Sequence, residues 1–444
     1  MFFDLQKLKT DLTAVIAKSV DGGLSIGADE VEVMVARDQG LEVSVRRGRI
    51  ENLELSNDFS LSISVLFGKR KGSVSSTNFD DSSIKSLLAK AKDLTLLLEE
   101  DPHYGLAPGG LNPKKLVELD LYHPWITEPT DAVAIALAIE RAGLSLNEKL
   151  LRPDSAEVST TNSLVGYGNS NGFSAVIPRS RHSMSSVFVA EEKNGMQRDY
   201  WYSMARDPEE LRQADEVGKE AARRSLAKLN PERPISGVFP VLFAPDCASS
   251  LISHFISAVN GSSQFKKASF LLDRIGQKIF PEWLTIMENP LEPRSLGGAF
   301  FDSDGVQTRN NKFVTDGVLT SYVLSNYSAK RLGLETTGNA GGVRNLTLAG
   351  PSSGQKDLLK KIGRGVLVSS LMGQGVNIVN GDYSRGASGF WVENGKISHA
   401  IDNFTIAGNL SDMFFGIQAL GDDADKRFNV RTPSILVDSM AVAS

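Results

Sequence analysis

The segment ADEVEVMVAR, residues 28–37, sets the pattern of the N-terminal half of the chain. Its valines recur at every second position, a period typical of a strand with one buried face. Apolar residues at helical spacing precede it in residues 5–16, and charged, glycine-containing turns interrupt the apolar runs that follow it. Those runs lie at residues 41–45, 53–55 and 61–67. Caps at residues 80–83 then predict a helix to about residue 94, which completes a helix–strands–helix unit.

The same order of elements returns after residues 99–129, a segment dense in proline and glycine. An alanine-rich helix is expected over residues 130–146. A second helix is expected from Asp207 to about residue 229, because Asp207 can cap it and a proline follows at its first position. The strands expected between these helices lie at residues 156–167, 172–176 and 184–190. We therefore expect two helix–strands–helix units in series.

A glycine-rich region with short apolar runs follows the break at residues 231–240. Thr315-Asp316-Gly317 and Glu393-Asn394-Gly395 are strong hairpin signals, since Asn-Gly and Asp-Gly adopt the backbone that tight hairpins need. The expected fold class is α+β, with two helix–strands–helix units followed by a Gly-rich, largely antiparallel β domain at the C-terminus. The expected domain boundaries are 1–120, 121–232 and 233–444.

The composition excludes several classes of protein. The chain has 444 residues and a formal net charge of -5, which argues against a general nucleic-acid binder. It has a single cysteine, Cys247, so no internal disulfide and no CxxC metal site can form. Charged residues interrupt the apolar ones near the N-terminus, and no apolar run approaches the roughly 20 residues of a membrane helix. We expect a cytoplasmic protein that contacts neither membrane nor nucleic acid.

The segment LISHFISAVNG, residues 251–261, reads as an amphipathic helix with one histidine. A zinc peptidase helix needs two histidines one turn apart and a glutamate beside the first. Phe255 follows His254, and the next turn offers Ala258 and Val259 instead of a second ligand. We therefore assign no catalytic and no metal-binding residue in this chain. His254 is interpreted as a structural residue of this helix or as a contact for substrate or partner, and Cys247 as a small buried residue.

Residues 371–395, LMGQGVNIVNGDYSRGASGFWVENG, contain an unusual density of glycine. Such a segment can hold an extended peptide through main-chain hydrogen bonds, or it can be an irregular β region that needs tight turns. Both interpretations, a peptide-binding segment and an irregular β region, remain open. The candidate contacts for substrate or partner are Asp382, Tyr383, Arg385, Trp391 and His254, with Phe390 and Trp391 as packing or edge groups.

Three long segments resemble the TldD/PmbA family, the modulators of DNA gyrase, and within it the PmbA branch, also called TldE. They are residues 270–290 (FLLDRIGQKIFPEWLTIMENP), the glycine-rich segment 371–395, and residues 405–413 (TIAGNLSDM). The resemblance spans nearly the whole chain. It implies a cytoplasmic metallopeptidase of two homologous subunits, TldD and TldE, that degrades unfolded peptides and processes peptide precursors.

In the TldD branch the resemblance implies a metal held by two histidines of a HExxxH helix and by a cysteine near the C-terminus. The equivalent helix here is LISHFISAVNG, and the C-terminal segment FNVRTPSILV carries Arg431 and Thr432 where the cysteine is expected. The resemblance thus implies a subunit without metal, paired with a TldD-like paralogue that carries zinc. Alone, such a chain is expected to form a homodimer. The alternatives are a self-sufficient peptidase with a cryptic site around His254, and a protein adaptor with no peptidase role.

Overall fold

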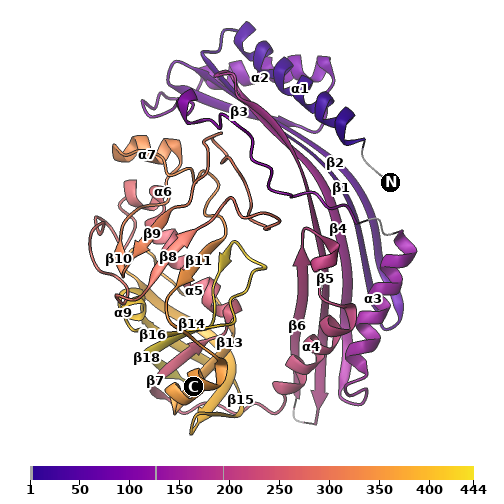
Figure 1. Ribbon diagram of the computed structural model, residues 1–444, viewed down its shortest axis with the longest axis vertical. Helices are drawn as coiled ribbons and strands as arrows, with labels where there is room; N and C mark the ends of the chain where they lie inside the picture. The colour runs from indigo at the N-terminus through magenta and orange to yellow at the C-terminus, as the bar shows by residue number, and fades with distance from the viewer. Residues whose placement is uncertain (1–3, 126–127, 194) are drawn as a thin grey trace.

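The computed structural model describes residues 4–125, 128–193 and 195–444. The N-terminal half is an arched sheet in the order β3-β2-β1-β4-β5-β6, and the C-terminal domain lies on its concave side (Figure 1). All neighbouring strands of this sheet are antiparallel. Its strands are β1 (Glu30–Arg46), β2 (Arg49–Phe67), β3 (Arg70–Ser76), β4 (Leu151–Asn169), β5 (Ser174–Glu192) and β6 (Gly195–Ala205).

Helices cover the convex face of the arch (Figure 1). They are α1 (Leu5–Ser25), α2 (Asp81–Leu96), α3 (Pro129–Leu144) and α4 (Ala214–Ala227). The alternating valines of β1 point to this face: Val33 lies opposite Ile63 of β2, Val35 lies opposite Leu61, and all four side chains are buried. The period of two therefore decides which face of the sheet binds the helices.

The two predicted helix–strands–helix units share one sheet, because β1 pairs with β4 from Glu32 to Val45. The strands are longer than expected. The runs predicted at 31–35 and 41–45 belong to the single strand β1, and those at 53–55 and 61–67 belong to β2. Backbone pairing on both sides carries β1 across its polar centre, which a hydrophobic pattern cannot reveal. The boundaries at residues 120 and 232 stay a prediction.

The second helix of the second unit begins later than predicted. Asp207 does cap a turn, since its side chain accepts a hydrogen bond from the backbone N–H of Glu209, but this turn is a short 3-10 helix, Pro208–Glu210. The α-helix itself starts at Ala214 and is capped by Gln213 without a side-chain hydrogen bond. The cap at Asp207 is confirmed, whereas the prediction that the α-helix starts there is wrong.

The C-terminal domain contains a seven-stranded sheet, β12-β16-β18-β15-β14-β13-β7, and a five-stranded sheet, β10-β9-β8-β11-β17. Most neighbouring strands are antiparallel, with parallel pairs at β13–β7, β12–β16 and β11–β17. The strands are β7 (Gly237–Phe243), β8 (Thr285–Glu288), β9 (Lys312–Thr315), β10 (Val318–Leu319), β11 (Leu346–Ala349), β12 (Ser352–Ser353), β13 (Gly365–Met372), β14 (Asp382–Glu393), β15 (Lys396–Asn409), β16 (Ile417–Gly421), β17 (Val430–Arg431) and β18 (Ile435–Ala443). The α+β class is confirmed.

The helices of this domain are α5 (Pro245–Val259), α6 (Gly261–Phe265), α7 (Asn326–Leu332), α8 (Gln355–Ile362) and α9 (Leu410–Phe415). Helix α5 buries Leu251, Ile252 and Phe255 in the largest core of the molecule. Both predicted hairpin turns are present, between β9 and β10 and between β14 and β15. Asn394 and Gly395 have φ values of 52° and 71°, the left-handed backbone that these residue types allow.

In the part of the chain that the structure describes, none of the helices combines the length and the apolar composition needed to cross a membrane.

Candidate functional site

A cavity of about 1280 Å³ opens between the arch and the C-terminal domain. Strand β6 and helix α4 form one wall, and the start of α5 and the segment after β16 form the other. The walls carry many charged side chains beside a few apolar ones such as Trp201 and Phe390. A cavity lined by this mixture of charged and apolar groups can accommodate a flexible polar chain, so it is the first candidate for a binding site.

Buried charges connect the two walls of the cavity. Asp199 of β6 pairs with Arg224 of α4 at 3.3 Å and with Lys228 at 2.9 Å. Asp246, in the first turn of α5, lies 3.6 Å from both Arg224 and Arg427. Burial raises the pKa of Asp246, and the two guanidinium groups only partly oppose this effect. Arg224 thus links the arch to α5.

Arg427 strengthens the same contact from the C-terminal domain. Its Nη2 lies 2.6 Å from Asp425, and its Nη1 donates to the carbonyl of Tyr202 at 2.6 Å. The guanidinium also stacks over the rings of Trp201 and Tyr202, at 4.2 and 4.0 Å from their centroids. Planar arginine side chains combine ion pairing and stacking in this way, so Arg427 fixes β6 against the C-terminal domain.

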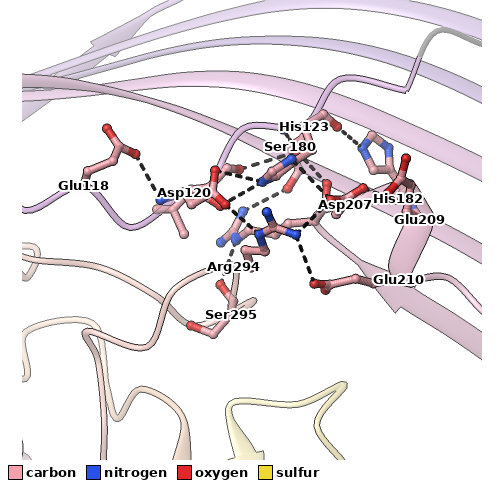
Figure 2. Close-up of polar contacts among 12 residues, drawn as sticks. Glu118, Asp120, His123, Ser180, His182, Asp207, Glu209, Glu210, Arg294 and Ser295 are labelled. Atoms are coloured by element: carbon pink, nitrogen blue, oxygen red, sulfur yellow. Dashed lines mark hydrogen bonds and ion pairs between the residues drawn. The ribbon is translucent and has the colours of Figure 1, made fainter.

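A second polar cluster, which includes the cavity-lining residues Arg294 and Glu210, joins the two parts (Figure 2). Arg294 contacts three carboxylates there: Asp120 at 2.6 Å, Asp207 at 3.2 Å and Glu210 at 3.7 Å. His123 lies between Asp120, at 3.1 Å, and Asp207, at 3.4 Å. The hydrogen bond from Arg294 is the main reason that the pKa of Asp120 is lowered.

Buried groups behind this cluster hold the loop that carries His123. His182 of β5 donates from Nε2 to the carbonyl of His123 at 2.7 Å, and its Nδ1 lies 2.7 Å from the hydroxyl of Thr160. Burial lowers the pKa of His182, which favours its neutral form. Arg206 donates to the carbonyls of Ser295 and Leu296, both at 2.7 Å. The second cluster therefore rests on a network of backbone contacts.

The structure brings together three of the residues predicted from the sequence. Arg385 of β14 donates from Nη1 to the hydroxyl of Ser250 on α5 at 2.9 Å. The ring of His254, one turn further along α5, lies 6.0 Å from the ring of Tyr383. His254 Nε2, Tyr383 Oη and Arg385 Nε are all buried without a hydrogen-bond partner among the described residues. Burial lowers the pKa of His254, with a smaller contribution from Arg385, and burial raises the pKa of Tyr383.

The other predicted residues lie elsewhere. Asp382 is exposed, and its carboxylate accepts a hydrogen bond from Asn380 at 2.6 Å. Trp391 is buried, donates from Nε1 to Glu393 at 3.0 Å and packs edge-on against Phe239. Phe390 packs against the separate core under α8 and reaches the cavity wall. The glycine-rich segment, residues 371–395, thus contains the end of β13, the loop 373–381, strand β14 and the turn that follows it.

The residues around α5 do not fit a zinc site. His254 faces the guanidinium of Arg385 and the phenol of Tyr383, and a cation beside a histidine repels a metal ion. Thr432 is buried, and its hydroxyl donates to the carbonyl of Pro245 at 3.1 Å, so the C-terminal segment does lie against the start of α5. Over residues 4–125, 128–193 and 195–444 there is no group of three His, Cys, Asp or Glu residues that could hold a metal ion.

Sequence reasoning did not find the charged groups of the cavity. Asp199, Arg224, Asp246 and Arg427 come from four separate segments, and each has an ordinary neighbourhood in the sequence. Arg224 and Lys228 are four residues apart, so both lie on one face of α4. This spacing is the single local feature of the sequence that indicates a charged cluster. Their convergence depends on the fold.

Three family profiles match the chain: PmbA/TldA metallopeptidase domain 1 at residues 31–95, the central domain at 122–229 and the C-terminal domain at 236–444. Metalloprotease PmbA of Escherichia coli O157:H7 is 38% identical over 432 residues, which cover 97% of this chain and 96% of that protein. Other curated relatives are named Metalloprotease TldD homolog.

Solved structures share the fold at lower identity. A protein of Bacteroides thetaiotaomicron, named for a proposed role as a modulator of DNA gyrase, superposes with a TM-score of 0.92 at 24% identity and covers 100% of both chains. TldE of Thermococcus kodakarensis gives a TM-score of 0.85 at 22% identity and covers 97% of this chain and 100% of its own. Together with the full-length sequence match, these findings confirm the resemblance, and the chain belongs to the PmbA/TldD metallopeptidase family.

Proposed function

We propose that this chain is the subunit without metal of a cytoplasmic two-subunit peptidase, paired with a zinc-bearing TldD-like paralogue. One observation carries the proposal. Helix α5, to which the family resemblance assigns the metal-binding histidines, presents a single histidine beside Arg385, and Thr432 meets its N-terminal end. In an otherwise complete fold, a helix with one histidine, and with an arginine of β14 beside that histidine, is what a non-catalytic subunit would carry.

The role of such a subunit would be to admit and position an unfolded peptide or a peptide precursor. The cavity supports this role because its walls offer both signs of charge and aromatic rings, which can contact a chain of varied sequence. The unpaired groups of His254, Tyr383 and Arg385 are further candidates for peptide contact, with Asp382 at the adjacent surface.

The test compares the pure chain with the chain co-expressed with a TldD-like paralogue. We expect the complex to contain zinc and to cleave an unfolded peptide, and the pure chain to contain no stoichiometric zinc and to show no cleavage. Metal analysis and peptide mass spectrometry measure both properties. One tightly bound zinc per pure chain, with cleavage that a chelator abolishes, would overturn the proposal.

The same experiment separates the alternatives. A self-sufficient peptidase predicts cleavage by the pure chain that is lost in His254→Ala and retained in Ser257→Ala, an exposed position on the same helix. A protein adaptor predicts a stable complex that cleaves no peptide.

A further inference from the structure

The first half of β2, residues 49–60, has an unpaired outer edge. Strand β3 pairs with β2 only from Leu61 to Phe67. Before Leu61, the described residues make no ladder contact with the side of β2 that faces away from β1. The backbone N–H and C=O groups along this edge are therefore available to pair with another strand. Proteins usually cover or block such edges because they can otherwise pair with other chains.

The same half of the strand is exposed on both faces. Ile50, Leu53 and Leu55 are 54%, 43% and 69% exposed. They lie opposite Val45, Val43 and Leu41 of β1, so they belong to the face that binds helices, beyond the area that α3 covers. A row of exposed apolar side chains along an open edge is typical of a surface that a partner buries.

The opposite face of residues 49–60 is acidic. Glu54 lies directly opposite Glu42 of β1, and Asp58 lies opposite Asp38. Burial, with Glu42 as the second cause, raises the pKa of Glu157 on the neighbouring strand. Among the described residues, Glu42, Glu54 and Asp58 have no ion pair with a cation. Like charges directly opposite each other destabilise a sheet, so this arrangement favours a cationic neighbour from outside.

We propose that residues 49–60 of β2 dock a partner subunit of this same fold whose edge strand carries basic and apolar side chains, so that the two arched sheets become continuous. The inference rests on the proposed function, because it supplies the surface through which the paralogue would bind. A folded subunit can cover the edge and both faces, whereas an added peptide strand covers little beyond the edge.

Charge favours a paralogue over a second copy at this surface. Residues 49–60 contain one arginine against three carboxylates, Glu51, Glu54 and Asp58. Neighbouring strands lie about 5 Å apart, so two copies of this edge would place their carboxylates close together. A partner with lysine or arginine at the facing positions removes this repulsion and selects the mixed pair.

The test measures the affinity of the full chain for the metal-bearing paralogue by surface plasmon resonance. It also follows amide hydrogen exchange in the complex. We expect Leu55→Asp and the double variant Glu54→Lys/Asp58→Lys each to weaken binding at least about tenfold. Leu97→Asp, which changes an 83% exposed leucine elsewhere on the arch, should bind like the wild type. Amides of residues 49–60 should exchange more slowly in the complex.

A second arm mixes the charge-reversed double variant with the wild-type chain. We expect these two to pair more tightly than two wild-type copies, and Leu55→Asp in both to abolish the pairing. If the wild type fails to bind the paralogue but this engineered pair forms, the docking surface stands and the proposed function fails. The inference would be overturned if all variants bound the paralogue like the wild type. It would also be overturned if the double variant paired with the wild-type chain no better than two wild-type copies do and the amides of residues 49–60 exchanged no more slowly in the complex.

Discussion

Two of the charged contacts between the arch and the C-terminal domain differ in burial. Arg427 is 15% exposed and lies between aromatic rings and buried carboxylates. Arg294, in the second cluster, is 46% exposed and pairs with an equally exposed Asp120 (Figure 2). Water screens an exposed pair, whereas removing one partner of a buried pair leaves a charge without solvent. Arg427 and Arg294 therefore contribute unequally to the stability of this interface, although both are arginines paired with carboxylates.

The largest loss of stability is expected when Arg427 is removed. Arg427→Ala should lower the free energy of unfolding by about 3 kcal/mol or more, because Asp425 would lose its buried partner and Asp246 would lose one of its two. Urea denaturation measures the change. The matched control is Arg223→Ala, which removes an exposed arginine that pairs with Glu220 on its own helix. Equal stability of the two variants would contradict the importance of the buried contact.

The pH dependence of stability also distinguishes the two charged contacts, through Asp246 in the first and Asp120 in the second. The pKa of Asp246 is raised, so its carboxyl favours folding below the unfolded value of 3.8, and this contribution is lost as the pH rises through the folded pKa. The pKa of Asp120 is lowered, so its contribution is present above 3.8 and is lost as the pH falls through the folded pKa.

Relative to the wild type, Asp246→Asn should therefore gain stability as the pH rises from about 3 to 7, and Asp120→Asn should lose stability over the same range. Thermal unfolding at a series of pH values measures both differences. The assignment of opposite electrostatic environments would be wrong if the two differences had the same sign.

The smallest effect is expected at the exposed contact. Arg294→Ala should lower the melting temperature slightly at low salt, and the difference should disappear near 1 M salt because the Debye length falls to about 3 Å. The loss in Arg427→Ala should persist under the same conditions. A salt-independent loss in Arg294→Ala as large as that of Arg427→Ala would remove the distinction between the two contacts.

Much of the fold could be predicted because its signals are local. The alternation at Val31, Val33 and Val35 predicted a strand with one buried face, and Asn394-Gly395 predicted a hairpin, since both patterns depend on neighbouring residues alone. The continuity of β1 through Arg37 to Gly40 was missed because long-range pairing, and not hydrophobicity, keeps that segment extended.

The candidate site was predictable only in part. His254, Tyr383 and Arg385 drew attention as unusual residues of one helix and one glycine-rich segment, and they do meet. Asp382 and Trp391 have the same local signals, but the alternating faces of β14 and its bulges direct them elsewhere.

By itself, the sequence determined the α+β class, the hairpin turns, the family and the lack of a HExxxH pattern in residues 251–261, because each is written in contiguous residues. Only the tertiary structure decided that the first two units form one arch, that Arg224 and Arg427 meet Asp246 in the wall of the cavity, and that residues 49–60 have a free edge. These features depend on which distant segments pair and pack, and such contacts are fixed by the free energy of the whole fold.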